Sequence, residues 1–414
     1  MRPTVLFSLA LGSALALAQG PLHANQSPLP TPDAATAATP TPDLPVPRAD
    51  VLSAPNVAGT AWILIDHDSG QVLAGHNIDT PVHPASITKV MTSYIVADHL
   101  AHGRIKDDDA VFVSERAWRQ GGAGTDGSFT ALKVNDSVAL EDVVRGLVVQ
   151  SGNDASIALA EHIAGSEEAF ADLMNQYAQR LGMSNSHFVN ASGLTAEGHM
   201  MSVRDIATLS RALIHDFPEH YKLYSIKEYT YGGIRQYNRN GLLWRDSTVD
   251  GIKTGHTAAA GYCLAVSAKR GDQRLISVVV GIEGGRNEAF RLREEANQAL
   301  LAYGFRAFET HRLYQAGQAV ATPELWRSAD DTAQLTVASD LHVTIPRGRY
   351  DDLKAEMVMP PVLIGPLQAG QEVGAVSVTL AGEEVAQVPL VSMAEHGGAG
   401  FFRRVWHDIL LLFE

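Results

Sequence analysis

Two patterns of apolar positions recur along this chain, short strand-like runs and longer stretches with helical spacing. The runs "TAWILID" and "QVLAGHN" flank "HDSG" and predict a β-hairpin with a glycine turn. Apolar residues three and four apart predict one helix over residues 86–100 and two more in "LEDVVRGLVVQ" and "ASIALAEHIAG". The last of these should end at Gly165, because glycine suits a helix C-cap.

The second half of the chain changes from mixed patterns to strands alone. "GYCLAVSAKRGDQRLISVVVGIEGG" predicts two strands joined at residues 270–273, and "EAFRLREEANQALLAYGF" predicts a helix that closes the first domain near Phe305. After Thr310, runs such as "LHVTIPRG" and "VAQVPLVSM" are separated by Gly and Pro and have no helical period. This pattern of short apolar runs separated by turn residues indicates a small all-β domain that ends near Met393.

The last fourteen residues, "FFRRVWHDILLLFE", have the pattern of an amphipathic helix. One half of the helical wheel holds apolar side chains: Phe401, Phe402, Val405, Trp406, Ile409, Leu410, Leu412 and Phe413. The helix would be about 21 Å long, short of the roughly 30 Å hydrocarbon core of a bilayer. We expect it to lie in a membrane surface, because "EHGGAG" detaches it and aromatic residues with arginines suit the interface. Docking on the protein's own β domain is the alternative.

The N-terminal residues predict export from the cytoplasm. In "MRPTVLFSLALGSALALAQG" one arginine precedes an apolar run, and Ala16-Leu17-Ala18 offers a small-x-small cleavage site. The run of about fourteen residues is too short to span a bilayer comfortably, so a signal peptide over residues 1–18 is favoured over an uncleaved anchor. Residues 19–48 are rich in Pro, Ala and Thr and predict a disordered linker.

Composition narrows the functional classes. The 414 residues are 45% hydrophobic and 19% charged, as in globular proteins, and the length favours two domains. The formal net charge of −14 argues against nucleic acid as a partner, because phosphate binding needs a basic face. Cys263 is the only cysteine, so no internal disulfide can form, and no Cys/His spacing indicates zinc. We expect no metal and no cofactor.

Ser86 and Lys89 form an SxxK motif near the start of the first predicted helix. Positions i and i+3 of a helix share a face, so Oγ of Ser86 and Nζ of Lys89 can meet. A serine hydroxyl is a weak nucleophile until a base takes its proton. Lysine can be that base only if burial or nearby positive charge keeps it neutral. A snorkelling surface lysine is the alternative for this motif taken alone.

Two further short motifs follow. Ser151 and Asn153 stand in the break between two predicted helices, where such residues are common as turns and caps. In a cleft, Ser151 could pass protons between a nucleophile and a leaving amine, and Asn153 could hold a substrate amide. Lys253-Thr254-Gly255 leads into a predicted strand, where glycine would let a substrate backbone approach. A solvated strand end is the alternative for this triplet.

The three motifs occur once each and in this order, with 65 residues from Ser86 to Ser151 and 102 from Ser151 to Lys253. A closely similar set belongs to penicillin-binding proteins and class A β-lactamases. "NRNGLLWRDSTVDGIKTGHT", "AGTDGS", "RGLVVQSGNDA", "YGFRAFET" and "TIPRGR" resemble the low-molecular-mass D-alanyl-D-alanine carboxypeptidases of the penicillin-binding protein 5/6 group. The resemblance covers about residues 57–414 and departs mainly in the linker and in "GIEGGRNEAFRLR".

This resemblance implies a fold and an activity. The fold would be α/β: a penicillin-binding, β-lactamase-like transpeptidase domain with an antiparallel sheet flanked by helices, then a small all-β domain and a C-terminal amphipathic helix. Lys89 would take the proton of Ser86, which would attack the D-Ala–D-Ala carbonyl of a peptidoglycan pentapeptide and form an acyl-enzyme. β-Lactams would acylate the same serine. Backbone N–H groups of Ser86 and His256 would hold the oxyanion. The terminal carboxylate would be bound by Lys253, Thr254 and Arg239.

The expected organisation is a signal peptide at 1–18, a linker at 19–48, a catalytic domain at 49–308, a β domain at 309–395 and a membrane helix at 399–414. The protein would be exported and attached through that helix to the periplasmic face of the bacterial inner membrane. There it would act in cell wall biogenesis and cell shape.

Two other functions stay open. A class A β-lactamase shares the motif plan, but its deacylating glutamate, usually in E-x-x-L-N, has no counterpart between Asn153 and Lys253. Such an enzyme would also need no residues beyond about 310. A catalytically inactive scaffold that binds peptidoglycan or assembly partners is the second alternative, since a fold never guarantees chemistry. The presence of all the motif side chains favours the carboxypeptidase.

Overall fold

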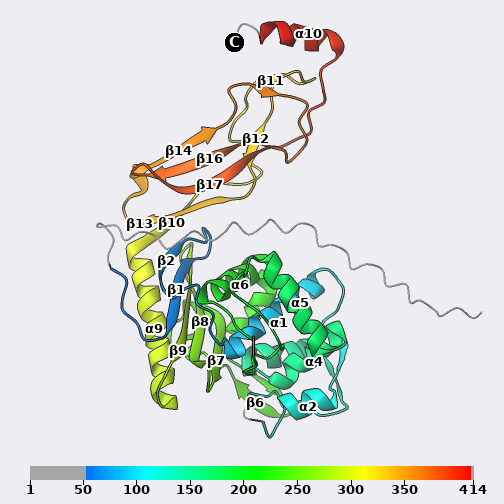
Figure 1. Cartoon of the computed structure of the whole chain (residues 1–414), viewed down its shortest axis with the longest axis vertical. Helices are drawn as coiled ribbons and strands as arrows, with labels where there is room; N and C mark the ends of the chain where they lie inside the picture. The colour runs from blue at the N-terminus through cyan, green and yellow to red at the C-terminus, as the bar shows by residue number, and fades with distance from the viewer. Residues whose placement is uncertain (1–52, 126, 412–414) are drawn as a thin grey trace, which may run out of the picture. The chain divides into compact units, whose positions relative to one another are not determined.

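The computed structural model describes residues 53–125 and 127–411, so the predicted signal peptide and linker lie outside the described residues. A five-stranded antiparallel sheet forms the centre of the first domain (Figure 1). Its strand order is β2 (Val72–His76), β1 (Ala61–Asp66), β9 (Gln273–Ile282), β8 (Gly261–Arg270) and β7 (Val249–Thr257). Both predicted hairpins are confirmed, and β1 pairs with β9 although more than 200 residues separate them.

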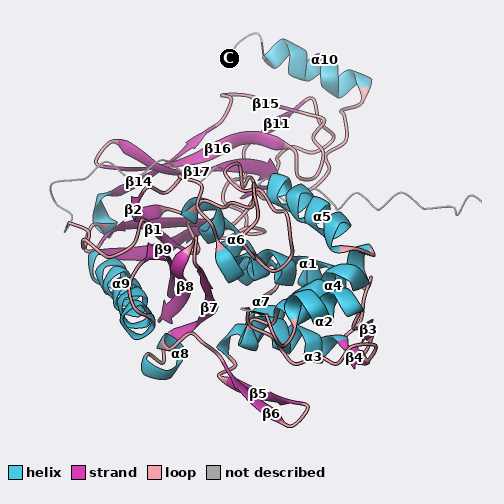
Figure 2. Ribbon diagram, turned by 60° about the horizontal axis from the view of Figure 1, so that its bottom comes forward, coloured by secondary structure: helices cyan, strands magenta, loops and turns pink. Residues whose placement is uncertain are grey.

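Both faces of this sheet are buried, which explains why its central strands β1, β8 and β9 are mostly apolar. Ile63 and Val278 point into one core, which is shared with the helices between β2 and β7. Leu64 and Val279 point into a second core with α9 (Arg286–Ala307), the predicted closing helix. Figure 2 shows α9 on one side of the sheet and the other large helices on the opposite side.

The helical side of the sheet consists of short and medium-length helices with clear sequence signals at their ends. Side chains of Ser114, Ser166 and Ser202 cap three of them by accepting a backbone N–H. Gly165 ends another in the left-handed conformation, as predicted. These helices are α1 (Lys89–Ala101), α2 (Glu115–Gly121), α3 (Leu140–Arg145), α4 (Asn153–Ala164), α5 (Glu167–Arg180), α6 (Val203–Asp216) and α7 (Pro218–Tyr221). Helix α8 (Leu242–Arg245) instead places Leu242 and Leu243 in the second core, with α9.

Two small hairpins and two short helices complete the first domain. The hairpins are β3 (Ala110–Phe112) with β4 (Ser137–Ala139), and β5 (Glu228–Tyr231) with β6 (Ile234–Tyr237). A π-helix, η2 (Gly146–Gln150), continues α3, so the predicted helix in "LEDVVRGLVVQ" changes type half-way. A 3₁₀ helix, η3 (Lys222–Ser225), follows α7.

The predicted helix over residues 86–100 is wrong at its start. Ala85–Thr88 form a 3₁₀ helix, η1, and the α-helix begins only at Lys89. Pro84 precedes this turn and Ala85 has φ +48°, so the chain enters it from a conformation that a regular α-helix cannot contain. In a 3₁₀ helix the side chains at i and i+3 eclipse one another. The tighter turn therefore brings Ser86 and Lys89 closer together than an α-helix would.

The second domain is all-β, as predicted. Its four-stranded antiparallel sheet has the order β12 (Leu335–Val337), β17 (Glu383–Ser392), β16 (Glu372–Leu380) and β14 (Leu353–Val358). Two pairs complete it: β10 (Phe308–Tyr314) with β13 (Leu341–Pro346), and β11 (Leu325–Trp326) with β15 (Leu363–Ile364). Alternate residues such as Val376 and Val378 of β16 fill its separate core. A short 3₁₀ helix, η4 (Tyr350–Asp352), precedes β14.

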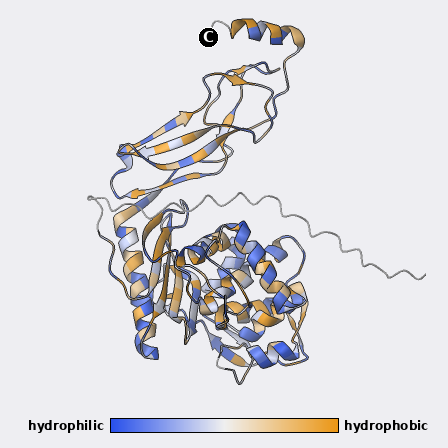
Figure 3. Cartoon of the chain, in the orientation of Figure 1, coloured by the Kyte–Doolittle hydropathy of each residue, from blue (hydrophilic) through white to orange (hydrophobic). Residues whose placement is uncertain are grey.

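The C-terminal helix α10 (Phe401–Leu410) has no buried residue. Its polar side contacts the β domain, where Arg403 pairs with Asp331 at 2.5 Å and the backbone N–H of Arg327 donates to Nδ1 of His407 at 2.8 Å. Figure 3 shows apolar and polar residues alternating along it. The exposed large apolar side chains are Phe401, Phe402, Val405, Trp406, Ile409 and Leu410. No helix among the described residues has the length and apolar character needed to cross a membrane.

Candidate active site

The hydroxyl of Ser86 lies beside the amine of Lys89. Nζ of Lys89 donates a hydrogen bond to Oγ of Ser86 at 3.1 Å, through the geometry of η1. It donates two more, to Oδ1 of Asn153 at 2.6 Å and to the backbone carbonyl of Ser192 at 2.6 Å. Since Lys89 is 1% exposed, these three protein oxygens replace the water that an exposed ammonium would bind.

Burial keeps the Lys89 amine close to neutral. Loss of solvent is the largest cause and lowers the pKa of Lys89 from 10.5 to about 7. Asp154 and Glu167 act in the opposite direction, and the positive charge of Arg239 adds to the lowering. Near neutral pH, about half of the molecules would carry an uncharged amine, which can accept a proton.

Ser151 carries a buried hydroxyl in a strained backbone position. It is 3% exposed and has φ 67° and ψ 36°, the left-handed region that non-glycine residues rarely adopt. Its Oγ has no hydrogen-bond partner among the residues that the structure describes. Strain and an unpaired buried hydroxyl at the same residue are typical of a site built for a ligand.

Asn153 is the first residue of α4 rather than a loop residue. Its backbone N–H donates to the carbonyl of Ser128 at 2.8 Å, while its side-chain oxygen accepts from Lys89. The sequence predicts a contact with a substrate amide. The structure shows instead that Asn153 holds the Lys89 amine in place.

Gly255 allows strand β7 to lie against the turn that carries Ser86. A Cβ atom placed on Gly255 would be 3.0 Å from the carbonyl oxygen of Pro84 and 3.3 Å from the backbone N of Ser86. A larger residue would therefore push η1 away from the strand. Lys253 and Thr254 precede this contact and are 3% and 8% exposed. The strand that carries Lys253-Thr254-Gly255 and the turn that carries Ser86 thus contact each other through their backbones.

Positive charge gathers beside this strand. Burial is the main cause that lowers the pKa of Lys253 well below its usual value, and Lys89, Arg239 and Arg293 add to the effect. Arg239 donates to Oγ of Ser128 at 2.5 Å, and Arg293 donates to the carbonyl of Arg239 at 3.1 Å. A carboxylate that enters here would favour the charged forms of these groups. His256, at the exposed end of β7, stacks on Tyr262.

Several residues that contact the site were not predicted from the sequence. Asp154 is fully buried and accepts hydrogen bonds from the backbone N–H groups of Thr130 and Leu132, which fix a loop beside Asn153. The only sequence signal for Asp154 was its position directly after the Ser151-Gly152-Asn153 motif. Ser192 acts through its backbone carbonyl, which no residue pattern reveals. Glu167 accepts the backbone N–H of Ala191 at 3.1 Å and so supports the segment that carries this carbonyl.

His199 supports the same segment from the other side. Its Nε2 is 2.8 Å from Oγ1 of Thr88, and its Nδ1 accepts the backbone N–H of Val189 at 3.0 Å. Because Nδ1 is an acceptor, the proton of the neutral ring is assigned to Nε2. Burial lowers the pKa of His199 to about 4, so the ring stays neutral near pH 7. This histidine links the SxxK turn to the chain that leads to Ser192.

We expect His199→Leu to slow acylation by a β-lactam about tenfold, because a small displacement of catalytic groups is costly. His199→Gln should restore most of the rate, since glutamine offers one donor and one acceptor. Stopped-time mass spectrometry of the covalent adduct measures both rates, and thermal unfolding reports stability separately. Equal rates in the leucine and glutamine variants would contradict this positioning role.

Two family models match this chain. Residues 48–284, more than half of the chain, match the family model described as D-alanyl-D-alanine carboxypeptidase. The chain belongs to this family. Residues 308–397 of this carboxypeptidase-family chain match a second model, that of the C-terminal domain of penicillin-binding protein 5. The resemblance expected from the motifs is confirmed.

Curated relatives span nearly the whole carboxypeptidase-family chain. The D-alanyl-D-alanine carboxypeptidase DacC of Escherichia coli is 44% identical over 366 residues, covering 88% of this chain and 90% of the relative. DacA of the same organism is 44% identical over 363 residues, covering 87% and 89%. The solved structure of penicillin-binding protein 5 from Haemophilus influenzae matches with a TM-score of 0.78 and 38% identity, over 84% of this chain and 99% of that one. The predicted penicillin-binding fold with its all-β second domain is confirmed.

In the part of the chain that the structure describes, no group of three or more His, Cys, Asp or Glu side chains is placed to hold a metal ion. The structure brings together Ser86, Lys89, Asn153 and Gly255 by direct contact. Lys89 and Arg239 lie close enough to Lys253 for their positive charges to lower its pKa.

Proposed function

We propose that this protein is a serine-type D-Ala-D-Ala carboxypeptidase that removes the terminal D-alanine from peptidoglycan pentapeptides, in cell wall biogenesis and the maintenance of cell shape. One observation carries the proposal. The buried amine of Lys89, with a pKa lowered to about 7, donates to Oγ of Ser86 at 3.1 Å. A neutral amine at that distance can remove the hydroxyl proton when the serine attacks a carbonyl.

Acylation is proposed as follows. Lys89 takes the proton of Ser86 as Oγ bonds to the carbonyl carbon of the penultimate D-alanine. Backbone N–H groups of Ser86 and His256 stabilise the negative oxygen of the tetrahedral intermediate. The C–N bond then breaks, and Ser151, whose hydroxyl has no protein partner among the described residues, passes a proton to the leaving amine. An ester between Ser86 and the shortened peptide results, and water hydrolyses it.

The substrate's free carboxylate is proposed to bind at the cationic side of the site. Lys253 and Thr254 on β7 supply an ammonium and a hydroxyl, and Arg239 supplies a guanidinium. Charge-assisted hydrogen bonds to a carboxylate are about twice as strong as neutral ones. This arrangement selects a peptide bond next to a C-terminus, which is the property of a carboxypeptidase.

β-Lactams are proposed to acylate Ser86 in the same way, but their opened ring keeps the leaving amine in the site. Rapid hydrolysis in class A β-lactamases depends on a glutamate that activates water, and the E-x-x-L-N string of that group is missing between Asn153 and Lys253. We therefore expect slow turnover of penicillin. Rapid catalytic hydrolysis would favour the β-lactamase function instead.

The test is incubation of the purified protein with a D-Ala-D-Ala pentapeptide, with and without benzylpenicillin. We expect release of one D-alanine per peptide, loss of this activity after penicillin treatment, and a covalent adduct of one penicillin per chain. Absence of both the adduct and the release would favour the inactive scaffold.

The proposed location is the periplasmic face of the bacterial inner membrane, reached after cleavage of a signal peptide at residues 1–18. A catalytic domain at 49–308 and a β domain at 309–395 would follow the linker, and residues 399–414 would attach the protein to the membrane. The outward apolar face of α10 supports this attachment, because exposed Phe and Trp side chains partition into the membrane interface.

We expect the double variant Phe402→Ser and Trp406→Ser to bind lipid vesicles at least about tenfold more weakly, since each aromatic side chain contributes about 1.5–3 kcal/mol when fully buried. D-Alanine release from a soluble pentapeptide should be unchanged. Sedimentation with vesicles that contain anionic lipid measures the binding. The matched control removes two exposed apolar side chains of the β domain, Val358→Ser and Ile364→Ser. Equal loss in both double variants would contradict attachment through α10.

A further inference from the structure

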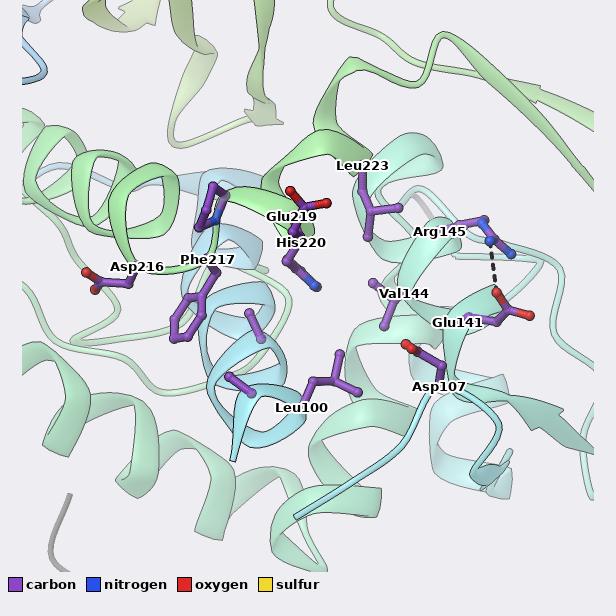
Figure 4. Close-up of a pocket in the computed structure, with 13 residues that line it drawn as sticks. Leu100, Asp107, Glu141, Val144, Arg145, Asp216, Phe217, Glu219, His220 and Leu223 are labelled. Carbon is purple, nitrogen blue, oxygen red and sulfur yellow. Dashed lines mark hydrogen bonds and ion pairs between the residues drawn. The ribbon is translucent and has the colours of Figure 1, made fainter. Parts of the chain in front are cut away.

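A cavity of about 550 Å³ lies on the helical side of the catalytic domain, and none of the residues assigned to catalysis lines it (Figure 4). Its walls come from the C-terminal end of α1, from α3, and from the segment that joins α6 to η3. The volume falls within the range of about 300–1,000 Å³ that is typical of small-molecule sites. The cavity therefore has the size of a ligand site separate from the active site.

Aliphatic and aromatic side chains form the inner surface of this cavity. Figure 4 shows Leu100 of α1, Val144 of α3 and Leu223 of η3 around one space, with Phe217 beside them. Ala97, which also lines the cavity, leaves room because its side chain is a single methyl group. An occupant would gain free energy by burying an apolar body against these residues.

Negative charge surrounds the apolar surface. The carboxylates that line the cavity are Asp107, Glu141, Asp216 and Glu219, and Arg145 is the one lysine or arginine among the lining residues. Arg145 is already paired with Glu141 at 2.9 Å, Glu219 is paired with Lys222 at 2.6 Å, and Asp216 is paired with His215 at 2.8 Å. The local charge is therefore negative even after these pairs are counted.

Two groups at the cavity decide the sign of the charge that a ligand should carry. Within the described ranges the side chain of Asp107 makes no hydrogen bond or ion pair, so its exposed carboxylate is available to a ligand. The neutral ring of His220 adds no positive charge that could balance the Asp107 carboxylate. Burial lowers the pKa of His220 to about 4, and its Nε2 is hydrogen-bonded to Oγ of Ser93 at 2.8 Å. A cation in the cavity would therefore meet the unpaired carboxylate of Asp107, with no unpaired lysine or arginine among the lining residues.

We propose that this cavity is a second ligand site and that it takes a small organic cation, namely a primary ammonium group attached to an apolar body. The apolar body lies against Leu100, Val144 and Leu223, and the ammonium group lies near Asp107. An anion of the same shape is rejected because it would face the same carboxylates. The ligand class is thus opposite in charge to the carboxylate-bearing substrate proposed for the active site.

The test compares three probes of the same shape by calorimetry on the full-length protein at neutral pH. They are 2-phenylethylamine, which is a cation, 2-phenylethanol, which is neutral, and 3-phenylpropionate, which is an anion. We expect the amine to bind most tightly and the carboxylate to show no binding. The amine should bind with the same Kd after treatment with benzylpenicillin, because its site is separate. Equal binding of the three probes, no binding of the amine, or its loss after penicillin treatment would overturn the proposal.

Variants then locate the bound amine. Asp107→Asn should raise its Kd about two- to fivefold, as expected for one partly exposed charge pair. The matched control is Asp108→Asn, a neighbouring exposed carboxylate that does not line the cavity, and it should leave the Kd unchanged. Ala101→Trp, at the exposed end of α1, should fill the cavity and abolish binding without disturbing the core. Equal effects of the two aspartate variants, or unchanged binding in Ala101→Trp, would contradict this location.

Discussion

Ser86→Ala is expected to abolish release of D-alanine from a pentapeptide and to prevent formation of a covalent penicillin adduct. The variant lacks the only atom that can form the acyl ester in this mechanism, so kcat should fall by at least about 10⁴-fold. The fold should survive, because the Ser86 side chain makes one hydrogen bond among the described residues, with Lys89. An assay of free D-alanine and intact-protein mass spectrometry measure the two losses.

The matched control for this substitution is Ser137→Ala, an exposed serine on strand β4. It should release D-alanine and bind penicillin as the unmodified protein does. Persistent release by the Ser86→Ala variant, with the adduct found on another residue, would exclude Ser86 as the nucleophile and leave the family assignment untouched.

Lys89→Arg should lower the acylation rate by about 10²- to 10⁴-fold, the usual range for loss of a general base. Arginine keeps a positive charge and a long side chain, but it cannot give up its proton in a protein. The change therefore separates the need for a neutral amine from the need for a cation beside Ser86. The rate of adduct formation with benzylpenicillin, followed by mass, measures the effect.

An exposed lysine provides the control for the lysine substitution. Lys106→Arg, in the loop after α1, should leave the acylation rate unchanged. Thermal unfolding of Lys89→Arg is needed beside the rate, because a larger side chain in a fully buried position destabilises the fold. A well-folded Lys89→Arg protein that acylates at the normal rate would show that another group is the base.

The order of elements and the two-domain organisation followed from apolar patterns, because each strand and helix buries a face whose period the sequence records. The predicted start of α1 was wrong for a physical reason. Helical spacing of apolar residues does not distinguish a 3₁₀ turn from the first turn of an α-helix. That difference brings Ser86 and Lys89 together more closely than the motif alone implies.

The candidate site was predictable where side chains carry its chemistry and not where the backbone does. SxxK and SxN named Ser86, Lys89 and Asn153, which the structure joins directly. The carbonyl of Ser192 and its support by His199 depend on contacts between segments more than 100 residues from Lys89 in sequence. The left-handed conformation of Ser151 is likewise invisible in a pattern of residue types.

The pH dependence of acylation by benzylpenicillin tests most directly whether an amine held near neutrality activates the serine. Protonated Lys89 cannot act as a base, so with a pKa of about 7 the acylation rate should fall about tenfold for each pH unit below neutrality and level off above it. The Lys89→Arg protein should show no such inflection. A rate that stays constant from about pH 5 to pH 9 in the unmodified protein, measured by mass with the fold intact, would contradict the account.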